Sequence, residues 1–102
     1  MTYLVTGHFK FTSDGMARAQ ELMASIQQLG RTEPGMLRYS FYPDPNIEHG
    51  YFLFEEWESK APHDDHFNRD EMQAWAPELF TLLAEQPQVS YFDAALSSTL
   101  EM

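Results

Sequence analysis

Residues 34–58 read PGMLRYSFYPDPNIEHGYFLFEEWE, and this stretch decides the fold. Two runs of β-favouring residues, Met36 to Tyr42 and Gly50 to Glu58, lie on either side of the turn-forming residues 43–46. Apolar or aromatic side chains occupy both odd and even positions of each run, so they point to both faces of the predicted strands. The stretch therefore predicts a long hairpin that is apolar on both faces.

The sequence before the hairpin predicts one strand and one helix. Residues Tyr3 to Phe11 favour a strand. After the polar cluster at 12–14, apolar side chains recur at helical spacing from Met16 to Leu29, and Gly30 is expected to end the helix. The Pro34-Gly35 pair then forms the turn into the hairpin.

The sequence after the hairpin predicts a broken helix. Ser59 can cap a short helix through Phe67, and Asn68 with Glu71 resembles a second capping box. Pro77 is expected to kink or restart the second part, because proline lacks a backbone donor. That second part has one apolar face, formed by Met72, Trp75, Ala76, Leu79, Phe80 and Leu83.

A last strand from Val89 to Leu96 and a tail at 97–102 complete the chain. The order strand, helix, strand, strand, helix, strand predicts one α+β domain over residues 1–102, with its core at about 3–96. It is the order of the ferredoxin-like βαββαβ fold with a four-stranded antiparallel sheet. Helices normally cover one face of such a sheet. Because both faces are apolar here, we expect a second copy to cover the other face, giving a homodimer with two sheets packed together.

Composition excludes several classes of partner and chemistry. The formal net charge is -10, which disfavours nucleic acid and anionic membrane surfaces. The absence of cysteine excludes disulfides, thiol catalysis and thiolate metal sites. No apolar run approaches the length of a membrane span, and the start lacks a signal-peptide pattern. A cytoplasmic protein without membrane or nucleic-acid partners is therefore expected.

Several segments of the chain resemble the antibiotic biosynthesis monooxygenase family, over about residues 3–95. The matching segments are Pro34–Tyr42, Asp44–Asn46, Phe52–Lys60 and His66–Phe67. The most specific feature is a strand that ends Glu-x-Trp, here Glu55 and Trp57, followed nine residues after the tryptophan by a helical histidine, His66.

This resemblance implies a dimeric α/β barrel with a pocket between the sheet and the helices of each subunit. Characterised members oxidise polycyclic or quinol-like aromatics with molecular oxygen and without metal, flavin or haem. The resemblance thus implies a cofactor-free monooxygenase that acts on a small aromatic substrate and O2. The family also includes haem-degrading relatives and an isomerase of a phosphorylated signalling sugar derivative, so membership predicts the fold better than the reaction.

Three residues of the Glu-x-Trp and histidine pattern are candidate catalytic residues. His66 is the candidate base, because imidazole titrates near neutrality. The alternative is a structural histidine bonded to Glu55. Trp57 could stack on a substrate ring and donate its N–H, or could simply be part of the core. Glu55 shares the strand face of Trp57, where it could orient His66 or lie as a charge at the rim.

Four further residues are candidates for substrate binding. The Arg38 guanidinium could hold a phenolate, although an ion pair with an acidic residue is the alternative. Tyr39 and His8 could line the pocket from neighbouring strands, and Tyr51 shares the strand face of Glu55. His63 and His66 lie on one helical face, but no further ligand cluster accompanies them, so we expect no metal.

Two other functions stay open. An isomerase of a small polar or phosphorylated molecule would need clustered Arg or Lys, which this acidic chain mostly lacks. A non-catalytic binding or stress-response module could use the same barrel to hold an apolar ligand. Haem degradation is less favoured, because the asparagine that haem-degrading relatives carry on the first strand is absent near Gly7.

Overall fold

The predicted strands and helices all form in the computed structural model, which describes residues 1–102. In chain order the elements are β1 (Thr2–Lys10), α1 (Met16–Arg31), β2 (Met36–Pro43), β3 (Gly50–Trp57), α2 (Lys60–Phe67), α3 (Asp70–Thr81) and β4 (Gln88–Ala94). The four strands make one sheet in the order β2-β3-β1-β4, and every neighbouring pair is antiparallel. This arrangement confirms the predicted ferredoxin-like α+β fold.

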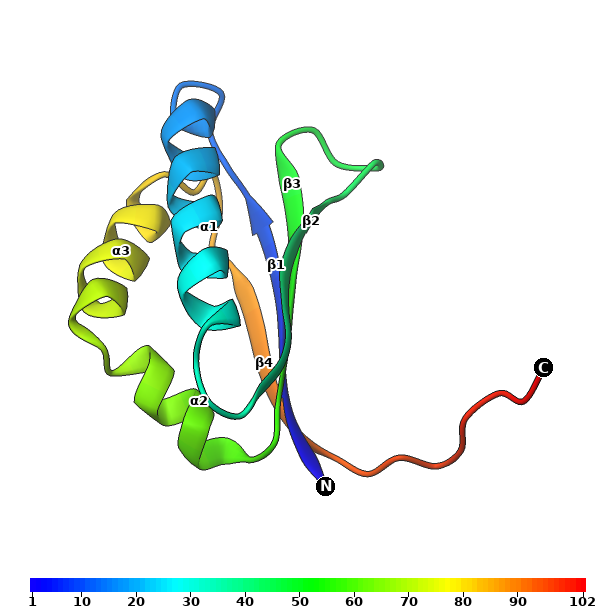
Figure 1. Cartoon of the computed structure of the whole chain (residues 1–102). Helices are drawn as coiled ribbons and strands as arrows, with labels where there is room; N and C mark the ends of the chain where they lie inside the picture. Colours follow the sequence, from blue (N-terminus) through cyan, green and yellow to red (C-terminus); the bar gives the residue numbers. More distant parts are fainter.

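The helices lie together on one side of the sheet (Figure 1). Side chains that alternate along β1 point toward them, and the core fills the space between. The most completely buried large side chains are Trp57, Phe11, Leu22, Ile26, His66 and Val5. Two of them, Trp57 and His66, were predicted as site residues, so the candidate site lies against the core.

The first helix does not end at Gly30, as the sequence suggested. α1 continues to Arg31, and Gly30 is buried within it. A Cβ atom at position 30 would lie only 2.6 Å from Cδ2 of Tyr39. Gly30 therefore serves the close approach of α1 to the Tyr39 ring, and the helix ends where the Thr32 hydroxyl bonds back to the Leu29 carbonyl oxygen (2.8 Å).

The second helical region is broken, as predicted, but its details differ. Arg69, not Asn68, is the N-cap of α3, and no side-chain capping bond forms there. The helix also runs through Pro77 without restarting. Pro77 is exposed, so the carbonyl that loses its intrahelical partner lies near water. None of the helices is both long and apolar enough to span a membrane.

No helix of the same chain covers the sheet face away from the helices (Figure 1). This face carries a strip of apolar side chains. Leu4 pairs with Phe92 across β1 and β4, and Phe54 follows on β3 opposite Thr6. Phe92 is 47% exposed. Such an apolar strip favours association with another surface.

We predict a homodimer that buries this face. Light scattering at micromolar concentration should give twice the chain mass of 11.9 kDa. Phe92→Lys should weaken or abolish the dimer, because it places a charge in the apolar strip. Glu85→Lys makes a charge change in an exposed loop and should leave the dimer intact. A folded parent that stays monomeric at this concentration would refute the dimer.

Candidate functional site

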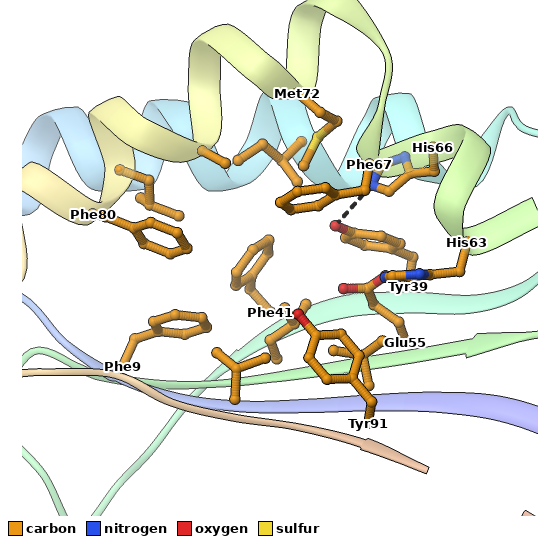
Figure 2. A pocket seen from close by; sticks show the side chains of 16 residues that line it. Phe9, Tyr39, Phe41, Glu55, His63, His66, Phe67, Met72, Phe80 and Tyr91 are labelled. Atoms are coloured by element: carbon orange, nitrogen blue, oxygen red, sulfur yellow. Dashed lines mark hydrogen bonds between the residues drawn. The ribbon is translucent and has the colours of Figure 1, made fainter. Parts of the chain in front are cut away.

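A cavity of about 120 Å³ lies between the sheet and the helices α2 and α3. Most of its lining is apolar: Val5, Phe9, Ile26, Phe41, Leu53, Phe67, Met72, Ala76, Leu79, Phe80 and Val89. The remaining lining residues are Tyr39, Glu55, His63, His66 and Tyr91. Figure 2 shows these five gathered at one end, whereas Phe9 and Phe80 lie at the other. The cavity thus has one polar and one apolar end, and no Lys or Arg lines it.

Local structure brings the polar end together. Tyr39 on β2 and Glu55 on β3 are direct cross-strand partners, so their side chains leave the sheet on the same face. His63 and His66 are three residues apart on α2 and therefore share the face that this short helix turns to the sheet. Both histidines are buried, with 7% and 1% of their surface exposed.

His66 is bonded at both ring nitrogens. Its Nδ1 lies 2.6 Å from Oε1 of Glu33. Its Nε2 lies 3.2 Å from the Tyr39 hydroxyl (Figure 2). A carboxylate can only accept, so Nδ1 carries the proton, and the Tyr39 hydroxyl donates to Nε2. Burial lowers the pKa of His66 below 6.5, while the Glu33 carboxylate opposes this by raising it. The imidazole is therefore neutral at neutral pH.

Glu55 is a buried acid without a cationic partner. Its Oε1 accepts a hydrogen bond from the Trp57 indole N–H at 2.9 Å, and only 5% of the residue is exposed. Burial raises the pKa of Glu55 to about 7, the charge of Glu33 adds to this, and the Trp57 bond opposes it. Burial, with the charges of Glu55 and Glu33, also raises the pKa of Tyr39 well above 10. Glu55 can therefore exist in either protonation state near neutral pH.

His63 lies at the rim of the polar end. Its ring contacts Tyr3 and Tyr91 at centroid distances of 5.1 and 5.7 Å, and its Nδ1 lies 3.0 Å from Asp64. Across the whole chain, no three histidine or acidic side chains lie close enough together to hold a metal ion. The two histidines of α2 are therefore bonded to acidic and aromatic neighbours and do not form part of a ligand set.

The structure brings three of the predicted site residues to the cavity, namely His66, Glu55 and Tyr39. Trp57 lies behind them: it is fully buried, does not line the cavity, and packs at 5.1 Å from the His66 ring. The predicted stacking of Trp57 on a substrate therefore has no support in the geometry. Its indole instead holds Glu55, while the carboxylate that bonds His66 belongs to Glu33 rather than Glu55.

Arg38 lies on the opposite sheet face. Its side chain is 75% exposed, and its Nε lies 3.8 Å from Glu56, which is the ion pair considered as the alternative. A β-bulge explains this position, because the pairing of β2 with β3 shifts by one residue between Met36 and Arg38. The extra residue turns Tyr39, instead of Arg38, toward the cavity.

His8 and Tyr51 also lie away from the cavity. His8 alternates onto the uncovered sheet face, where its ring is 5.1 Å from Phe52. Tyr51 does point toward the helices, but near the far end of the sheet, beside Phe11 at 6.0 Å and Gln20 at 3.4 Å. These two residues and Arg38 were expected to bind the substrate, but none of the three lines the cavity.

Glu33 is the residue that sequence reasoning missed. It lies in the loop between α1 and β2, outside any periodic pattern, and its partner His66 is 33 positions away. An acid beside a Pro-Gly turn is ordinarily exposed, yet Glu33 is 9% exposed. Only the tertiary fold identifies it.

Comparisons with known proteins agree with this architecture. Residues 2–78 match the sequence profile of the family described as antibiotic biosynthesis monooxygenase. The uncharacterized protein sll1783 of Synechocystis sp. is 28% identical over 97 residues, which are 95% of this chain and 66% of that protein.

Two solved structures illustrate the likeness in fold. Rv0793 from Mycobacterium tuberculosis superposes with a TM-score of 0.86 at 18% identity, covering 97% of this chain and 100% of that one. SnoaB from Streptomyces nogalater, a cofactor-independent oxygenase solved as a point mutant, superposes with a TM-score of 0.82 at 15% identity. The superposition covers 99% of this chain and 98% of that one. The matched profile covers most of the chain, which therefore belongs to the antibiotic biosynthesis monooxygenase family.

Proposed function

We propose that this protein is a cofactor-independent monooxygenase that oxidises a neutral phenol or quinol with O2. The observation that carries the proposal is the cavity, which is apolar except for one end where Glu55, Tyr39 and His66 lie together. Such a site suits an aromatic ring with a hydroxyl group that must lose its proton. Family membership and the fold shared with SnoaB, a cofactor-independent oxygenase, agree with the proposal.

The proposed reaction starts with loss of the hydroxyl proton. The resulting anion gives one electron to O2, which leaves a substrate radical and superoxide. These combine into a peroxide anion at a ring carbon that bears hydrogen. The base returns its proton to this anion, and loss of water from the resulting hydroperoxide leaves a carbonyl group. One oxygen atom thus enters the product and the other leaves as water. The protein's tasks are to take the proton and to hold the ring away from bulk water.

The size and charge of the cavity restrict the substrate. A cavity of about 120 Å³ has room for one aromatic ring, since an engineered apolar cavity of about 150 Å³ binds benzene in another protein. No Lys or Arg lines the wall, so a phosphorylated or carboxylated substrate would bring its charge there without a counterion. This disfavours the isomerase alternative.

Oxygen uptake by chelator-treated protein tests the proposal. We expect consumption of O2 with at least one member of a panel of single-ring phenols and quinols, with one oxygen atom from labelled O2 in the product. Ala76→Phe fills the cavity and should abolish uptake, whereas Ala74→Phe, on the exposed side of the same helix, should preserve it. Tight binding of phenols without uptake on any of them would favour the binding-module alternative.

A further inference from the structure

We propose that Glu55 is the group that accepts the substrate's hydroxyl proton, and that Glu33 and His66 are positioning residues that prepare it through Tyr39. This assignment rests on the proposed function and goes beyond it, because it selects one base among the groups at the polar end. It also differs from the expectation drawn from the sequence, in which His66 was the base.

The hydrogen bonds of His66 argue against direct proton transfer to it. Its Nδ1 proton is donated to Glu33 at 2.6 Å, and its Nε2 lone pair accepts from the Tyr39 hydroxyl at 3.2 Å. A ring with one lone pair, already occupied, can take a substrate proton only by losing the Tyr39 bond. His66 is therefore committed to its two neighbours.

The bonds of Glu55 leave it available. Trp57 holds Oε1, which fixes the direction of the carboxyl group, and the group lines the cavity. A carboxylate has lone pairs on both oxygens, so one donor does not exhaust it. Glu55 is thus the acceptor at the polar end that is both held in place and open to a ligand.

The direction of the hydrogen bonds prepares Glu55 for a proton. Glu33 fixes the tautomer of His66, so the Tyr39 proton points to Nε2. A hydrogen bond from the Tyr39 hydroxyl to Glu55 would lower the pKa of Glu55, but the hydroxyl cannot make that bond while it donates to His66. The Glu33–His66 pair thus withholds a donor that would keep Glu55 ionised, which favours the protonated form.

Charge leads to the same assignment. When ionised Glu55 takes the proton, the substrate O–H bond breaks, a carboxyl O–H bond forms, and the electron pair stays on the substrate oxygen. One negative charge is buried before and after this step. Transfer to neutral His66 would instead create a cation and an anion within an apolar cavity, which costs more. The raised pKa of Glu55 and the lowered pKa of His66 agree with this order of basicity.

No lysine or arginine faces Glu55. The titratable groups that face it are Tyr39 on β2, His63 and His66 on α2, and Tyr91 on β4, with Glu33 behind His66. None is a lysine or arginine, so no fixed cation holds Glu55 ionised. Its proton affinity is therefore free to respond to the tautomer of His66.

The test separates proton transfer from oxygenation by means of 4-nitrophenol, whose pKa lies close to that of Glu55 and whose phenolate absorbs at longer wavelength than its phenol. At a slightly acidic pH the free probe is mostly protonated, and we expect the parent to bind a larger fraction of it as phenolate. An infrared difference spectrum of the parent should then show a new protonated carboxyl band. Glu55→Gln, which keeps an oxygen for the Trp57 bond, should bind the probe as neutral phenol. Glu56→Gln, whose side chain points to the other sheet face, should behave as the parent.

Turnover of any quinol that the parent oxidises should follow the same pattern. Turnover by Glu55→Gln should fall roughly a hundred- to ten-thousand-fold, as expected for a general base. Glu33→Gln frees the His66 tautomer, so its turnover should fall less, and the acidic limb of its pH profile should move to lower pH. Glu33→Asp should restore that limb at least in part. These shifts test whether Glu33 acts on the pKa of Glu55, through its charge and through the His66 tautomer, because a purely structural role would not move the profile.

The possible failures are distinguishable. If Glu55→Gln retains full turnover while His66→Ala loses it, or if the bound probe stays protonated in the parent, the assignment is wrong even though the protein is an oxygenase. If phenolate forms only with Glu55 present and no quinol consumes O2, the assignment stands and the proposed function fails. The infrared measurement uses the parent alone and therefore decides the matter even if Glu55→Gln does not fold.

Discussion

Replacement of Trp57 by alanine should lower the free energy of unfolding by about 3–5 kcal/mol, the range for large aromatic side chains removed from a core. The Trp57 side chain is fully buried, and its ring lies 6.1 Å from Tyr39 and 5.1 Å from His66. Alanine would leave a cavity under the polar end and would remove the N–H that holds Glu55. Denaturant titration followed by circular dichroism measures the change.

Two matched variants separate packing from hydrogen bonding. Trp57→Phe keeps most of the buried ring but loses the N–H donor, so it should cost less stability than alanine. It should also raise the pKa of Glu55 above its value of about 7, because the Trp57 bond lowers it. Trp75→Ala removes a half-buried tryptophan from α3 and should be milder than Trp57→Ala. If Trp57→Ala were no more destabilising than Trp75→Ala, the central place of Trp57 in the core would be refuted.

Replacement of Glu33 by alanine should cost about 1–3 kcal/mol, because it leaves the Nδ1–H of His66 buried without an acceptor. Glu33→Gln still offers a carbonyl oxygen and should cost less. The same denaturant titration measures both. A Glu33→Ala variant as stable as the parent would mean that water replaces the carboxylate at no cost.

The pH dependence of the Glu33 variants has a definite sign. The pKa of His66 is lower in the folded chain than its ordinary 6.5, so the unfolded chain binds more protons as the pH falls below that value. His66 therefore makes the fold less stable toward acid pH. The Glu33 carboxylate raises the pKa of His66, so its loss should lower that pKa further and deepen the acid instability.

Glu55 affects the pH dependence of stability in the opposite sense to His66, so the choice of measurement matters. Its pKa of about 7 lies above the ordinary 4.5, so its contribution to stability is lost as the pH rises between these values. Melting curves would add the two effects together. Titration of the His66 ring resonances by NMR isolates the histidine. A higher His66 pKa in Glu33→Gln would contradict the expected role of Glu33.

The fold was largely predictable because its signals are local. Strand alternation and helical spacing identify the elements, and the apolar hairpin at 34–58 identifies their arrangement. The errors arise where tertiary contacts override local rules. Gly30 resembles a helix stop, but the reason for a glycine there is the ring of Tyr39 on another element.

The candidate site was predictable only in part. His66 and Glu55 belong to a recognisable spacing, and both reach the cavity. Glu33 could not be found, because its bond to His66 joins segments that only the folded chain brings together. Arg38 was misplaced because the bulge in β2 leaves no signal in the alternation of apolar residues.

The bulge between Met36 and Arg38 also bears on how such a site could evolve. Regular pairing of β2 with β3 from Met36 onward would place Arg38 opposite Glu55 and turn Tyr39 to the other sheet face. The cavity would then gain a fixed cation and lose its phenol, without a single substitution in the residues that form it. Insertion or loss of one residue in an edge strand can therefore exchange a preference for neutral ligands for a preference for anions.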